Sequence, residues 1–97
     1  GQIDGPSAGT AVTVALISAI TGKPVRQDIA VTGEISVSGK VRAVGGIFEK
    51  AYGAARAGMK DMIIPAENKD DITEHHLNMH IHAVTTIEEV LKLLTVD

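Results

Sequence analysis

A predicted helix begins within Gly45-Gly46-Ile47-Phe48-Glu49-Lys50-Ala51, between two regions that have the character of β-strands. The paired glycines permit a sharp turn into this helix, and Gly58 is placed to end it. The short apolar run Met62-Ile63-Ile64 follows, which is typical of a buried strand, and Pro65 closes that strand. A helix between strands predicts a fold of the α/β or α+β class.

The region before this helix predicts a β-hairpin and a buried helix. Apolar and polar residues alternate over residues 29–44, on both sides of Ser38-Gly39-Lys40, which indicates two strands joined by a tight turn. Residues 7–21 predict a helix that is apolar on nearly every side, ended by Gly22 with Pro24 two residues later. Such a helix needs cover from more than one direction.

The region after the helix predicts a further strand and a final helix. Residues 67–76 are polar and at most weakly helical, whereas residues 79–84 are expected to form a strand. Thr85 or Thr86 is expected to cap a last helix that runs through Leu94. At 97 residues, the chain is expected to form at most one domain.

Ser7 is the first candidate for chemistry. It lies in Asp4-Gly5-Pro6-Ser7-Ala8-Gly9, where a Gly-Pro turn meets the predicted helix. The free N–H groups of a first helical turn, together with the helix dipole, can stabilise the anion that forms when a nucleophile attacks a carbonyl. The Asp4 carboxylate either shapes this loop by accepting backbone N–H bonds or serves only as a turn residue.

Lys50 is the candidate base for such a nucleophile. At about 100° per residue, Lys50 falls beside Ala54 on the apolar side of its helix, away from Glu49 and Arg56. Burial there would disfavour the ammonium form and let the amine accept a proton from serine. On geometry alone, an ordinary lysine that extends its ammonium group to water fits better.

Four sequence blocks resemble the proteolytic domain of the ATP-dependent Lon proteases, in that family's order and spacing. The resemblance covers nearly the whole chain and includes the late stretch Thr86-Ile87-Glu88-Glu89-Val90-Leu91. It implies a mixed sheet with packed helices, similar to domain 2 of ribosomal protein S5. The blocks are Asp4-Gly5-Pro6-Ser7-Ala8-Gly9, Thr32-Gly33-Glu34-Ile35, Gly45-Gly46-Ile47-Phe48-Glu49-Lys50 and Ile64-Pro65-Ala66-Glu67-Asn68.

The resemblance implies a serine endopeptidase with a Ser-Lys dyad. Ser7 matches the family's nucleophile and Lys50 its general base, while Thr32 matches a threonine that hydrogen-bonds the catalytic lysine. The resemblance therefore favours a Lys50 amine buried on the apolar side of its helix over one that extends to water. Asp4 and Gly5 are expected to support the serine loop.

The resemblance also implies a larger protein. Residues 1–97 are expected to be the C-terminal part of a single Lon-type peptidase domain, whose upstream half would cover part of the apolar helix. Expected partners are unfolded or damaged protein substrates and five further copies in a homo-hexamer. ATP and Mg²⁺ are expected only in an ATPase region elsewhere in the full-length protein, and no cofactor or metal in this chain.

Composition narrows the classes of partner. The formal net charge is −3, and lysines and arginines are scattered, so nucleic acid is not an expected partner. The chain has no cysteine, which excludes disulfides and thiol catalysis and is compatible with the expected cytoplasmic location. The longest apolar stretch, residues 11–20, is too short to span a bilayer, so no membrane segment is expected.

A phosphate-binding or nucleotide-binding module, or a small-molecule kinase, is the alternative function, because a glycine-rich turn before a helix can also cradle phosphate. Residues 33–41 superficially resemble a phosphate-binding loop, but their spacing is one residue too long, so a hairpin turn is preferred. The pairs Asp70-Asp71 and Glu88-Glu89 are expected to be solvated charge. Metal binding is not expected from the four histidines, which are His75, His76, His80 and His82.

Overall fold

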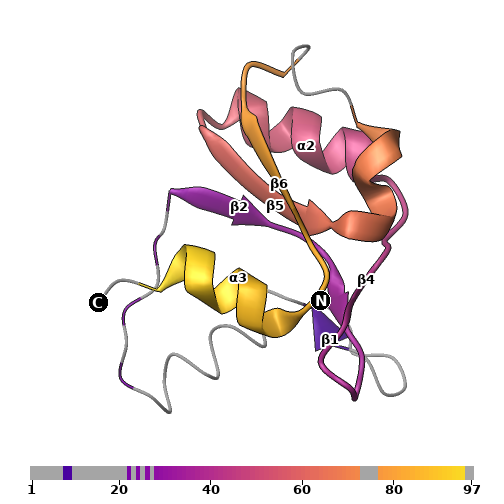
Figure 1. Ribbon diagram of the computed structural model, residues 1–97. Coiled ribbons are helices and arrows are strands. Elements are labelled where there is room, and N and C mark those ends of the chain that lie inside the picture. Colours follow the sequence, from indigo (N-terminus) through magenta and orange to yellow (C-terminus); the bar gives the residue numbers. More distant parts are fainter. Residues whose placement is uncertain are drawn as a thin grey trace.

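The computed structural model describes residues 8–9, 22, 24, 26, 28–72 and 77–95 (Figure 1). Helices and strands alternate along these residues, and the predicted α/β class is confirmed. In chain order the elements are β1 (Ala8–Gly9), β2 (Ile29–Val31), β3 (Glu34–Ile35), β4 (Val41–Arg42), α2 (Ile47–Arg56), β5 (Asp61–Pro65), the 3₁₀ helix η1 (Ala66–Asp71), β6 (His80–Val84) and α3 (Ile87–Leu94).

A parallel sheet with the strand order β2-β5-β6 forms the centre of the described structure. Ile29 pairs with Asp61 on one side of β5, and Asp61 pairs with His80 on the other. Helix α2 covers one face of this sheet and α3 covers the opposite face (Figure 1). The predicted buried strand is confirmed, because β5 is the middle strand and its residues from Met62 to Pro65 are all buried.

Two apolar clusters pack against the two faces of this sheet. Alternate residues of a strand point to opposite faces, so Met62 and Ile64 contribute to one cluster and Ile63 to the other. The cluster under α2 consists of Ile47, Ala51, Met62, Ile64, Leu77 and Met79. The cluster under α3 consists of Ile29, Ile35, Val41, Ile63, Val84, Val90 and Leu94.

The second sheet, with the order β1-β3-β4, is antiparallel. The predicted hairpin turn is confirmed, since the Gly39 N–H donates to the Ser36 carbonyl at 2.9 Å between β3 and β4. The prediction of only two strands over residues 29–44 is wrong. Gly33, which is buried and has φ +139°, changes the direction of the backbone between the end of β2 and the start of β3. As a result, β2 joins the parallel sheet, while β3 and β4 form the hairpin.

The predicted helix over residues 7–21 does not begin as expected. Ala8 and Gly9 form strand β1 and pair with Ile35 and Glu34 of β3, so these two residues belong to the antiparallel sheet. Glycine is a poor helix former, which lowers the cost of this extended start. Ser7 and residues 10–21 lie outside the described residues. Gly22, predicted to end the helix, has φ +76°.

Two further predictions, the strand over residues 79–84 and the final helix, are confirmed by β6 and α3. Thr86 is the N-cap of α3: its side chain accepts the Glu89 N–H, and Glu89 Oε1 accepts the Thr86 N–H at 3.1 Å. The expectation that Glu89 is only solvated charge is therefore wrong. Of residues 67–76, those up to Asp71 belong to η1, and residues 73–76 lie outside the described residues.

Candidate active site

Thr32 and the turn that leads into α2 lie at the carboxyl edge of the parallel sheet. Thr32 directly follows β2, and its N–H donates to the Ile63 carbonyl of β5 at 3.1 Å. Helix η1 directly follows β5, and its Asn68 accepts a hydrogen bond from Val44, the residue just before the glycine turn into α2. In open α/β sheets the crevice outside the carboxyl ends of the strands is the usual place for a ligand.

Lys50 stands in the first turn of α2, and its side chain is exposed. The Nζ atom donates a hydrogen bond to the Gly45 carbonyl at 3.2 Å. A Cβ atom placed on Gly46 would lie 3.9 Å from Nζ, so the lysine side chain folds back over the glycine turn. The glycines offer no side chains that could cover the amine.

The prediction that Lys50 is buried is therefore wrong for the described structure. Its neighbours Ile47 and Ala51 are buried, so Lys50 lies at the border of the apolar stripe and reaches outward.

The other predicted site residues are only partly placed. The side chain of Thr32 is half-buried at the carboxyl edge, and the hydrogen bonds found among the described residues include none between Thr32 and Lys50. Asp4, Gly5 and Ser7 lie outside the described residues. The roles of all these residues stay predictions.

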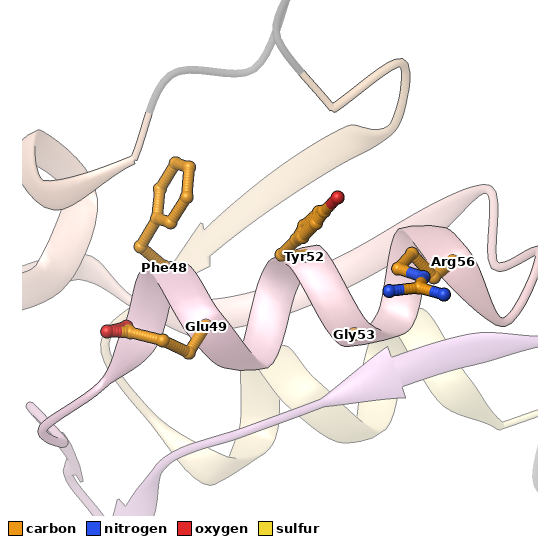
Figure 2. Close-up of a pocket in the computed structure, with 5 residues that line it drawn as sticks. All are labelled: Phe48, Glu49, Tyr52, Gly53 and Arg56. Carbon is orange, nitrogen blue, oxygen red and sulfur yellow. The ribbon is translucent and has the colours of Figure 1, made fainter.

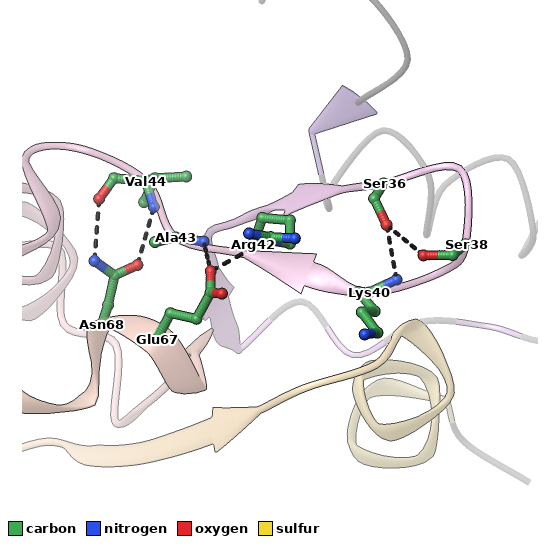
Figure 3. A network of polar contacts seen from close by, with 8 residues as sticks. All are labelled: Ser36, Ser38, Lys40, Arg42, Ala43, Val44, Glu67 and Asn68. Atoms are coloured by element: carbon green, nitrogen blue, oxygen red, sulfur yellow. Dashed lines mark hydrogen bonds and ion pairs between the residues drawn. The ribbon is translucent and has the colours of Figure 1, made fainter.

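Two residues of η1 hold the segment before the glycine turn, and we did not predict this role (Figure 3). Glu67 Oε1 accepts the Ala43 N–H at 2.7 Å and also contacts the Arg42 guanidinium at 3.3 Å. Asn68 Oδ1 accepts the Val44 N–H at 3.0 Å, and Asn68 Nδ2 donates to the Val44 carbonyl at 3.1 Å. The available signal was the fourth sequence block, Ile64-Pro65-Ala66-Glu67-Asn68, which contains both residues.

The Ala43 N–H lowers the pKa of the Glu67 carboxyl below its ordinary value, because this hydrogen bond favours the ionised form. The positive charge of Arg42 acts in the same direction, and partial removal from water opposes it. Glu67 therefore acts as an ionised acceptor at neutral pH.

A hollow of about 310 Å³ lies on the outer surface of α2, but Lys50 does not line it (Figure 2). Phe48 and Tyr52 project to the same side of the helix, each with 46% of its surface exposed. The Arg56 guanidinium lies 5.9 Å from the centre of the Tyr52 ring, within the range of a cation–π contact. The remaining lining residues are Glu49 and Gly53.

The histidines that the structure describes do not form a cluster of metal ligands. His82 Nε2 lies 2.9 Å from Asp61 Oδ1, which joins the neighbouring strands β6 and β5. Over residues 28–72 and 77–95, no group of three or more histidine and carboxylate side chains is suited to hold a metal ion. His75 and His76 lie outside the described residues. Within the same part of the chain, none of the helices has the length and apolar character needed to cross a membrane.

Comparison with known proteins identifies the class. The profile of a family of proteolytic domains, described as the Lon protease (S16) C-terminal proteolytic domain, matches residues 2–97. The chain belongs to this family, which confirms the resemblance inferred from the four sequence blocks.

Individual relatives agree with this assignment. The chain is 54% identical to a Lon protease of Haemophilus influenzae over 92 residues, which is 91% of this chain and 12% of the relative. It is 49% identical to a mitochondrial Lon protease homolog of Drosophila melanogaster over 98 residues, which is 97% of this chain and 10% of the relative. It is 51% identical to the Lon protease of Escherichia coli K12 over 94 residues, which is 93% of this chain and 12% of the relative. The chain thus spans 10–12% of the length of these curated relatives.

Proposed function

We propose that this chain carries the catalytic dyad of a serine endopeptidase, with Ser7 as nucleophile and Lys50 as general base. Lys50 accepts the hydroxyl proton while Ser7 Oγ attacks the substrate carbonyl, and the proton then passes to the leaving amine. Water hydrolyses the resulting ester, which releases the acid and restores the serine. Backbone N–H groups near Ser7 stabilise the oxyanion, and Thr32 orients the lysine amine.

The observation that carries this proposal is the family match over residues 2–97, which includes both the serine block and the lysine block. The structure adds support, because Lys50 Nζ is exposed at the start of α2 and, among the described residues, hydrogen-bonds one backbone acceptor, the Gly45 carbonyl. An amine held in this way can exchange the Gly45 carbonyl for a serine hydroxyl without breaking an ion pair. Asp4 and Gly5 shape the serine loop in the proposed site.

The wider proposal concerns the intact protein. It is an ATP-dependent protease that degrades unfolded or damaged proteins in the cytoplasm and assembles as a six-membered ring. ATP and Mg²⁺ act in an ATPase region outside residues 1–97, and the upstream part of the peptidase domain completes the substrate groove. The names of the relatives support the protease assignment.

The dyad is tested by substitution in the intact protein. Ser7→Ala and Lys50→Ala should each lower the cleavage rate of a fluorogenic peptide by at least about a hundredfold. Lys50→Arg should fail as well, because the guanidinium stays protonated. Lys60→Ala, which removes another exposed lysine, is the control and should retain full activity.

Retention of more than about a tenth of the activity by Lys50→Ala would overturn the dyad, because a general base normally contributes at least about a hundredfold. Labelling with a fluorophosphonate gives a second measurement. The reagent should modify Ser7 in the unaltered protein and react slowly in Lys50→Ala. Nucleotide binding by residues 1–97, together with full peptidase activity in both alanine variants, would favour the phosphate-binding alternative.

A further inference from the structure

Asn68 has unusual surroundings for a polar side chain. Only 4% of its surface is exposed, and among the residues that the structure describes it is the one polar side chain classed as buried. Its carboxamide makes three hydrogen bonds, two to Val44 and one from Nδ2 to Asp71 Oδ2 at 3.0 Å. A buried amide with its donors and acceptor satisfied holds its partners firmly, because breaking any bond leaves an unpaired polar group.

The two bonds to Val44 imitate the pairing of neighbouring strands. Oδ1 accepts a hydrogen bond from the Val44 N–H and Nδ2 donates one to the Val44 carbonyl, so one side chain holds both backbone polar groups of one residue (Figure 3). The next residues are Gly45 and Gly46, of which Gly46 has φ +65°. Glycine backbone moves easily, so an external clamp is needed to give this turn one conformation.

We call the three hydrogen bonds of Asn68 to Val44 and Asp71 the clamp. The clamp lies one residue away from the acceptor of the proposed base, Lys50. The carbonyl that accepts the bond from Lys50 Nζ belongs to Gly45, the residue after Val44. The Lys50 N–H in turn donates to the Gly46 carbonyl at 3.1 Å. A continuous set of contacts therefore runs from Asp71 through Asn68, Val44 and Gly45 to the lysine amine.

We infer that Asn68 is a positioning residue for Lys50, acting through Val44 and the Gly45 carbonyl. This inference rests on the proposed dyad of Ser7 and Lys50. The hydrogen bonds of Asn68 in the described part of the chain go to Val44 and Asp71 and not to the Lys50 amine, so Asn68 acts by keeping in place the carbonyl that orients the amine. Small displacements of a catalytic group lower the rate without a matching change in substrate binding.

The first test uses Asn68→Asp in the intact protein. This variant keeps an acceptor for the Val44 N–H, but it cannot donate to the Val44 carbonyl, and it places a carboxylate beside Asp71. We expect kcat for a fluorogenic peptide to fall at least about tenfold while KM changes less than about twofold.

A second readout does not depend on activity. Trace acetylation with acetic anhydride, followed by peptide mass spectrometry, measures the reactivity of each lysine amine. In Asn68→Asp, the labelling rate of Lys50 should rise about threefold or more relative to that of Lys60 in the same molecule, because an amine released from the Gly45 carbonyl is more accessible to the reagent. Lys60 lies outside the set of contacts and serves as the internal reference.

A surface variant keeps the inference testable if Asn68→Asp does not fold. Asp71 is exposed, so Asp71→Ala is expected to fold and removes only the outermost bond of the clamp. It should shift the labelling of Lys50 in the same direction, by a smaller factor. Asp70→Ala is the matched control, since Asp70 is an exposed neighbour for which no hydrogen bond to Asn68 is found in the described part of the chain, and it should leave the labelling ratio unchanged.

The outcomes separate the two proposals. Loss of cleavage in Ser7→Ala and Lys50→Ala, together with unchanged kcat and unchanged Lys50 labelling in a folded Asn68→Asp, would overturn the positioning role and leave the dyad intact. Equal labelling ratios in Asp71→Ala and Asp70→Ala would also overturn it. Altered labelling of Lys50 in a protein whose dyad variants still cleave peptide would support the clamp and reject the dyad.

Discussion

Glu67 Oε1 accepts the backbone N–H of Ala43 at 2.7 Å, which joins η1 to the strand segment that precedes the glycine turn. This residue and Asn68 hold consecutive residues, Ala43 and Val44 (Figure 3). The contact links residues 24 positions apart, so it exists only in the folded protein. Its contribution to stability therefore depends on the ionisation of Glu67.

The first prediction concerns this pH dependence. The pKa of Glu67 is lower in the folded protein than its ordinary value of 4.5. A carboxyl of this kind stabilises the fold above its unfolded pKa, and that stabilisation is lost as the pH falls through the folded pKa. Glu67→Gln cannot ionise, so its urea midpoint should lie below that of the unaltered protein at neutral pH and approach it below pH 4.5.

Hydrogen exchange of peptides from β5 is followed at increasing urea concentrations, and the urea concentration at which half of the protein is unfolded is determined at a series of pH values. A constant difference between the two proteins across this range would show that the ionised carboxylate does not stabilise the contact.

The second prediction compares the two glycines of the turn. Gly46 has φ +65°, a conformation that is unfavourable for residues with a Cβ atom, so Gly46→Ala should destabilise α2 by about 1 kcal/mol. Gly45 does not have a positive φ, and apart from its two neighbours in the chain no residue has a heavy atom within 4 Å of a Cβ placed there. Gly45→Ala should change the stability by less than about 0.5 kcal/mol. Hydrogen exchange of the α2 amides measures both, and equal effects would contradict the prediction.

The third prediction concerns the hydroxyl of Thr32. Thr32→Val keeps a β-branched side chain of similar volume and the N–H bond to the Ile63 carbonyl, so the sheet should remain intact. If the hydroxyl orients Lys50, kcat for peptide cleavage should fall about tenfold, less than on removal of the general base itself. Thr32→Ser retains the hydroxyl and is the matched control. An unchanged rate in Thr32→Val would remove Thr32 from the site.

The fourth prediction concerns the apolar core. Ile63 in β5 is fully buried and packs in the cluster under α3, so Ile63→Ala should destabilise the fold by about 3 kcal/mol through lost burial and a cavity. Val37, at the hairpin, is 84% exposed, and Val37→Ala should change the stability by less than about 0.5 kcal/mol. Urea unfolding measures the stability of both variants. A small loss of stability in Ile63→Ala would mean that the core collapses around the cavity.

Predictions from local sequence signals were the most successful. The hairpin at Ser38-Gly39-Lys40, the cap at Thr86 and the buried strand at Met62-Ile63-Ile64 each depend on residues that are close together in the chain. Turn geometry, a capping hydroxyl and an uninterrupted apolar run act within a few residues, so they leave a readable pattern.

Predictions that depended on distant partners were less successful. The residues Ala8 and Gly9 were expected in a helix, but pairing with Ile35 and Glu34 of β3 makes them a strand. Lys50 was expected to be buried, but the glycines beside it leave its amine exposed. Helical periodicity assigns a residue to one side of a helix, whereas its exposure depends on what other segments cover that side.

The α/β class, the hairpin turn, the buried strand β5, the final helix, the family and the candidate dyad could therefore be obtained from the amino-acid sequence. The assignment of β2 to the parallel sheet, the position of Lys50 Nζ on the Gly45 carbonyl and the clamp of Asn68 on Val44 required the three-dimensional structure. Backbone N–H and C=O groups are the same in every residue, so the sequence pattern does not reveal which distant segment a strand pairs with. Packing of the side chains in the folded protein decides it.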